Sequence, residues 1–137
     1  MKIVVDTNVL IDAFTHRQPY YEDAKSILQL ITNNEIEGFI TSSSITDIYY
    51  LIRKILSDFE AREIIRNLMT LFSVIDVSGA DCKAALDLEI GDFEDALIVV
   101  CGRKIKADYI VSRDEDFAKA SETLRVILPK VFLKKMK

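Results

Sequence analysis

Short apolar runs alternate along the chain with longer segments in which apolar residues recur at helical spacing. The short runs predict buried strands and the longer segments predict helices. The expected strands are 3–5, 38–41, 74–77, 109–111 and 126–128. The expected helices are 8–14, 20–31, 44–56, 59–72, 80–88 and one containing 96–101. This alternation indicates an α/β fold, a mainly parallel sheet covered by helices on both faces.

Two of the expected helices place acidic residues in unusual surroundings. In the helix 44–56, Asp47 lies roughly 140° from the centre of the apolar stripe, so it faces either solvent or the wall of a cleft. The segment 96–101 is apolar on every side, which predicts a buried helix. Asp92 and Asp95 near its start would then be partly buried, with no basic residue nearby in the sequence as a partner.

Length and composition indicate one domain with its own core. The chain has 137 residues, of which 50% are hydrophobic, and we expect a single domain over 1–137 with a core at 1–133 and a basic tail at 134–137. The longest apolar run is too short to cross a membrane, and an early aspartate argues against a signal peptide. Two scattered cysteines, Cys82 and Cys101, are typical of reduced thiols, so we expect a cytoplasmic protein.

The charge balance limits how the chain can contact nucleic acid. Its formal net charge is −4 at pH 7, whereas proteins that bind nucleic acid mainly through charge carry an excess of Lys and Arg. Any contact with a polyanion must therefore be local or bridged by cations.

Acidic residues follow two of the expected strands. Asp6 comes directly after the first strand, and Asp114 and Asp116 follow the strand 109–111. Ligands of open α/β sheets bind at the carboxyl ends of the strands, where strand order reverses. Asp92 and Asp95 are three residues apart, so both can project from one face of a first helical turn.

Each of these aspartates also has a purely structural interpretation. Asp6 and Asp92 are plausible N-caps, Asp95 favours a helix dipole, and Asp47 with Ser44 fits a capping box. Asp114 and Asp116 could be ordinary turn residues.

Several carboxylates without matching Lys or Arg repel one another, and a divalent cation removes that repulsion. All-oxygen ligands suit Mg²⁺ or Mn²⁺. The chain has four glycines and none of the glycine-rich phosphate-binding motifs. The single histidine, His16, is expected at the surface and has no nucleophile motif beside it.

These acids stand in motifs that resemble the PIN-domain nucleases and, within them, the VapC-like toxins of toxin–antitoxin pairs. The resemblance covers residues 3 to about 133. Its four motifs are 4–10 (VVDTNVL), 42–51 with Asp47, 92–98 (DFEDALI) and 111–117 (VSRDEDF). It implies a three-layer α/β/α sandwich around a mainly parallel sheet.

The resemblance implies a metal-dependent endoribonuclease. A metal-activated water would attack the RNA phosphate, leaving a 5′-phosphate and a 3′-hydroxyl, with Mg²⁺ or Mn²⁺ as cofactor. Asp6 and Asp95 would be the central ligands, with Asp47 and Asp114 beside them. The supporting residues that it implies are Asp92 and Asp116 at the metal site and Thr7, Asn8, Ser112 and Arg113 in orienting ligands or phosphate.

One residue departs from the family pattern. The second acid is most often Glu, and Asp47 is one methylene shorter, so it would reach a metal through water. The family also implies a homodimer and an antitoxin partner. Tyr20, Tyr21, Tyr50 and Phe59 could serve either interface, with core packing as the default expectation.

Two other classes remain as alternatives. A PIN fold without turnover, acting as an RNA-processing scaffold, would have a broken acidic set, and here every position is acidic. A signalling receiver domain would need an acidic pair after its first strand, where Asp6 stands alone.

Overall fold

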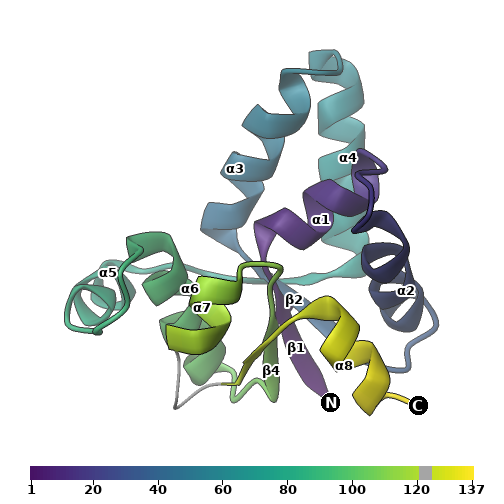
Figure 1. Cartoon of the computed structure of the whole chain (residues 1–137). Helices are drawn as coiled ribbons and strands as arrows, with labels where there is room; N and C mark the ends of the chain where they lie inside the picture. Colours follow the sequence, from purple (N-terminus) through teal and green to yellow (C-terminus); the bar gives the residue numbers. More distant parts are fainter. Residues whose placement is uncertain (121–124) are drawn as a thin grey trace.

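A five-stranded, fully parallel sheet forms the centre of the molecule (Figure 1). The computed structural model describes residues 1–120 and 125–137. The strands are β1 (Lys2–Val5), β2 (Glu37–Thr41), β3 (Ser73–Ile75), β4 (Tyr109–Val111) and β5 (Val126–Ile127). Their order in the sheet is β3-β2-β1-β4-β5, so the expected parallel sheet is confirmed.

Helices cover both faces of the sheet, which confirms the three-layer α/β/α arrangement. One face carries α1 (Thr7–Phe14), α2 (Tyr21–Thr32), α3 (Ser42–Arg53), α4 (Asp58–Leu71) and α8 (Pro129–Lys135). The other carries α5 (Gly79–Leu86), α6 (Phe93–Lys104) and α7 (Glu115–Ala120). Figure 1 shows α3 and α4 as a hairpin that extends beyond the carboxyl ends of the strands.

Alternating side chains of the strands feed two separate cores. Ile3 and Val5 of β1 pack against α1 to α4 and α8, whereas Val4 packs with α6 and α7. All three side chains are buried because the sheet is covered on both sides. Gly38 of β2 lies where a Cβ atom would come within 2.7 Å of Ile31 Cδ1 and 2.9 Å of the Phe72 ring, so a side chain here would force these neighbours to move.

The structure corrects several expected boundaries. α3 begins at Ser42 rather than Ser44, and its N-cap is Thr41, whose hydroxyl accepts a hydrogen bond from the Ser44 N–H. Two C-terminal helices, α7 and α8, were not expected. Pro129 does not only end the last strand but begins α8, because a proline at the first helical position has no N–H to satisfy. The last turn of α8 contains Lys134 and Lys135, which were expected in a basic tail.

Strand order reverses between β1 and β4. The chain runs from β1 outward through β2 to β3 and then crosses back to β4 on the other side of β1. The Asp6 N–H donates to the Val111 carbonyl at 2.9 Å, which joins the ends of the two strands. In the described part of the chain, no helix combines the length and apolar character needed to cross a bilayer.

Candidate functional site

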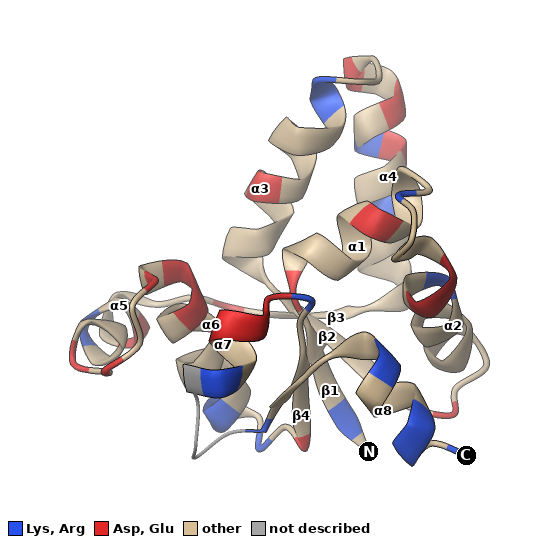
Figure 2. Ribbon diagram, in the orientation of Figure 1, with Lys and Arg blue, Asp and Glu red and all other residues tan. Residues whose placement is uncertain are grey.

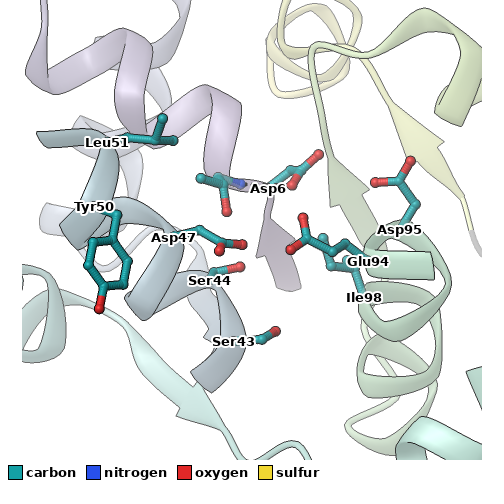
Figure 3. Close-up of a pocket in the computed structure, with 10 residues that line it drawn as sticks. Asp6, Ser43, Ser44, Asp47, Tyr50, Leu51, Glu94, Asp95 and Ile98 are labelled. Carbon is teal, nitrogen blue, oxygen red and sulfur yellow. Dashed lines mark hydrogen bonds between the residues drawn. The ribbon is translucent and has the colours of Figure 1, made fainter. Parts of the chain in front are cut away.

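A pocket of about 310 Å³ opens at the carboxyl end of β1, between α1, α3 and α6 (Figure 3). Ten residues line it: Asp6, Thr7, Ser43, Ser44, Asp47, Tyr50, Leu51, Glu94, Asp95 and Ile98. Four of them are acidic and none is Lys or Arg. Figure 2 shows acidic segments at the starts of α1, α6 and α7 and within α3, around the ends of the strands. The pocket therefore gathers negative charge without a balancing cation from its own lining.

Asp6 is the most buried of these acids. It is 8% exposed and is the N-cap of α1, where its carboxylate accepts the Thr7 N–H at 2.8 Å. The same carboxylate accepts the Ser112 hydroxyl at 2.7 Å. Burial raises the pKa of Asp6, these two hydrogen bonds lower it, and the nearby charges of Asp114 and Asp92 raise it.

Hydrogen bonds link Asp6 to the loop after β4. The Asn8 amide donates to Asp6 Oδ2 and to Ser112 Oγ, each at 3.4 Å. The Asp114 N–H donates to Ser112 Oγ at 3.2 Å. Ser112 is fully buried, so its hydroxyl orients a carboxylate from one strand end and the backbone of the other.

Asp95, in the first turn of α6, has a strongly raised pKa. Burial first, and then the charges of Asp6, Asp92, Asp114 and Glu94, raise the pKa of Asp95 to about 7. Asp92 is exposed and caps α6, accepting the Asp95 N–H at 3.1 Å. The start of α6 is thus at the pocket mouth rather than deep inside the protein, because Asp92 and its two neighbours Phe93 and Glu94 are exposed.

Asp47 faces the pocket, as its position on the helix allowed, and it does not form a capping box because Ser44 lies within α3. Figure 3 shows Asp47 and Glu94 pointing toward one another across the pocket. Burial and a hydrogen bond with Asp47 raise the pKa of Glu94. Glu94 was not among the site residues predicted from the sequence. Its position between Asp92 and Asp95 was the available signal.

The remaining predicted residues lie in the loop after β4 and at the start of α7. Asp114 is exposed, and its carboxylate accepts the N–H groups of Asp116 and Phe117, capping α7. Asp116 is exposed in the first turn of α7. The guanidinium of Arg113 is bonded to the buried Asp12, and its expected role in orienting ligands or phosphate stays a prediction. Asp6, Asp92 and Asp114 are therefore all helix caps as well as neighbours in one electrostatic cluster.

The oxygen atoms that line the pocket are of the chemical type that binds a hard divalent cation. Carboxylate and hydroxyl oxygens are the ligands that Mg²⁺ and Mn²⁺ prefer. Burial and then the neighbouring carboxylates raise the pKa of Asp95, and such a cation would offset the negative charge gathered there. Within residues 1–120 and 125–137, however, no three His, Cys, Asp or Glu side chains already stand in a metal-holding arrangement. The carboxylates are neighbours that would have to close around an ion.

Comparison with known proteins agrees with the fold and the motifs. The PIN domain model matches residues 2–116. Ribonuclease VapC1 of Aquifex aeolicus (strain VF5) is 27% identical over 121 residues, which cover 85% of this chain and 83% of that protein.

Solved structures of the same fold include toxins. The VapC20 toxin of Mycobacterium tuberculosis, described as cleaving the sarcin–ricin loop, aligns with a TM-score of 0.70 and 18% identity over 87% of this chain and 95% of its own. A toxin–antitoxin complex from Klebsiella pneumoniae aligns with a TM-score of 0.69 and 21% identity over 93% and 97% of the two chains. The family expected from the four acidic motifs is confirmed: the chain belongs to the PIN domain family.

Proposed function

We propose that this protein is a divalent-metal-dependent endoribonuclease and the toxin component of a toxin–antitoxin pair. The observation that carries the proposal is the pocket in which acids from the end of β1, from α3 and from the start of α6 meet without a Lys or Arg. The likeness to Ribonuclease VapC1 supports RNA as the substrate. A PIN-fold scaffold without turnover is disfavoured, because all four acidic motif positions are retained.

Asp6, Asp95 and Asp114 would hold Mg²⁺ or Mn²⁺, since their charges act on one another directly. Asp92 lies beside them, Asp47 would contribute through its hydrogen bond with Glu94, and Asp116 would stay at the margin. The bound cation would supply positive charge that offsets these carboxylates, stabilises the developing charge on the phosphate and lowers the pKa of water.

The chain's own polar groups would keep the acids in place during cleavage. The Thr7 N–H, the Ser112 hydroxyl and the Asn8 amide together orient the Asp6 carboxylate. Tyr50 is 63% exposed at the pocket edge, where its ring packs edge-on against Tyr49 and would stack on an RNA base. These groups position substrate and ligands, whereas the acids carry the charge.

Exposed apolar side chains support a protein partner. Tyr20, Tyr50 and Phe59, for which core packing was the default expectation, are 38%, 63% and 72% exposed. Ile55, in the turn between α3 and α4, is 68% exposed. A second copy of the chain or an antitoxin would cover part of this surface, and a homodimer with an antitoxin bound is the assembly that we propose.

We expect cleavage of structured RNA in Mg²⁺ or Mn²⁺ and none after EDTA is added. The products should carry 5′-phosphate and 3′-hydroxyl ends, because a water-derived oxygen joins the phosphorus and the 3′-oxygen leaves. End-labelled RNA, with phosphatase treatment of the fragments, identifies the ends. Cleavage that persists in EDTA, or a 2′,3′-cyclic phosphate product, would contradict the metal mechanism.

A further inference from the structure

A partly buried ion pair joins α1 to the loop after β4. Asp12 on α1 is 1% exposed, and its two carboxylate oxygens accept the Arg113 Nε–H at 2.6 Å and an Arg113 Nη2–H at 3.1 Å. The Tyr20 ring stacks on the same guanidinium, with its centroid 4.3 Å from Cζ. Neither Asp12 nor Tyr20 lines the acidic pocket.

Arg113 is attached to α1 at a second point. Its backbone N–H donates to Asn8 Oδ1 at 3.1 Å, while its side chain reaches Asp12 one helical turn further along. Two bonds to positions four residues apart on one helix fix both the distance and the direction of the loop relative to α1.

This attachment controls the geometry of the proposed ligands on both sides. α1 begins at its cap Asp6, and Asp114 is the residue next to Arg113. Ser112, on the other side of Arg113, contacts Asp6 through its hydroxyl and accepts the Asp114 N–H. Arg113 therefore stands between Ser112, which contacts Asp6, and Asp114, whose charge acts on Asp6.

We propose that Arg113 and Asp12 are positioning residues, which hold the Asp114 carboxylate against Asp6 and so set the affinity of the site for a divalent cation. The inference rests on the proposed function. A buried ion pair is often no more stabilising than apolar residues of the same size. The planar Arg113 guanidinium makes two bonds to Asp12 and so fixes the orientation of the loop. A lysine in the same place cannot make this two-bonded contact.

The test compares Mn²⁺ affinity, measured by titration calorimetry, in the parent, Arg113→Lys and Asp12→Asn. We expect affinity to fall about tenfold or more in both variants, as is usual when a residue supporting a metal ligand is removed. Circular dichroism selects a temperature at which every variant is folded. If Arg113→Lys does not fold, the more conservative Asp12→Asn carries the test.

A second ion pair, between a buried carboxylate and an exposed lysine, provides the control. Asp81 of α5 is 6% exposed and pairs with Lys104 at the far end of α6, at 2.6 Å. Asp81→Asn should lower the melting temperature as Asp12→Asn does, with Mn²⁺ affinity unchanged. If the affinity loss is equal in the two variants, it reflects general destabilisation and overturns the positioning role.

A double variant tests whether Arg113 acts through Asp114. In an Asp114→Asn background, Arg113→Lys should cause little further loss of affinity, because the residue that it positions no longer binds. Full additivity, or unchanged affinity in Arg113→Lys alone, overturns the inference and leaves the proposed function standing. If the parent neither binds Mn²⁺ nor cleaves RNA, both fail together.

Discussion

The Asp95→Asn variant is expected to lose more than about 100-fold in RNA cleavage and yet to be more stable than the parent at pH 8 without metal. Removing a residue that merely supports a metal ligand commonly costs 10- to 100-fold, so a direct ligand should cost more. Asparagine keeps the shape of the side chain and removes its charge. The gain in stability follows from removing a charge that is disfavoured first by burial and then by the neighbouring carboxylates, which together raise the pKa of Asp95.

The pH dependence of this gain has a defined sign. The pKa of Asp95 is about 7 in the folded protein against an ordinary value of 3.8. Between these values the folded state binds more protons than the unfolded chain, so the parent loses stability as pH rises through this window. The advantage of Asp95→Asn should therefore be absent below about pH 4, grow toward pH 7 and stay constant above it. Because Asp95 is only half-buried, about 1 kcal/mol is expected.

Thermal melts of both proteins from pH 4 to pH 8 in EDTA measure this effect. Asp87→Asn is the control, since Asp87 is exposed at the end of α5 and does not line the pocket. A variant that melts below the parent at pH 8 would instead show Asp95 acting as a charge favourable to the start of α6, which is worth about 0.3–1 kcal/mol.

Asp6→Asn is expected to remove most of the stabilisation that Mn²⁺ gives the parent. A cation present at 100 times its Kd stabilises a protein by about 2.7 kcal/mol when it binds only the folded state. The effect in the parent should be largest at pH 8 and shrink by pH 5.5, because the ion then competes with the proton on Asp95. Melting temperatures with and without Mn²⁺ at the two pH values give the comparison.

This comparison shows whether Asp6 is a metal ligand or only the N-cap of α1. Asp6 already accepts the Thr7 N–H as the cap of α1, and asparagine caps helices about as well as aspartate does. Asp6→Asn should thus fold normally, so a lost Mn²⁺ response would report the metal site itself. An undiminished response at pH 8 would mean that the cation binds elsewhere.

Much of the fold could be predicted because its signals are local. The β-branched runs fixed all five strands to within two residues, and the amphipathic spacing located α2, α3 and α4. A parallel sheet brings strand ends to one edge, so Asp6 and the loop with Asp114 were expected together before their contact through Ser112 was known.

The parts that could not be predicted depend on long-range contacts. Asp12 and Arg113 are 101 residues apart, and nothing in the neighbourhood of either indicates that they pair. Glu94 was one acid among several until the placement of α6 aimed it at Asp47. α8 is short and begins at a proline that also ends a strand pattern, so its helical character depends on burying Phe132 against the sheet.

Asp6, Asp95 and Asp114 are expected to bind the divalent cation that RNA cleavage requires. Anomalous diffraction from crystals of the active protein soaked in Mn²⁺ at pH 8 tests this expectation most directly. We expect an anomalous peak among these three carboxylates in the parent and none there in Asp6→Asn. A parent that cleaves RNA in Mn²⁺ while its peak lies away from these carboxylates, or a peak that persists unchanged in Asp6→Asn, would contradict the proposed site.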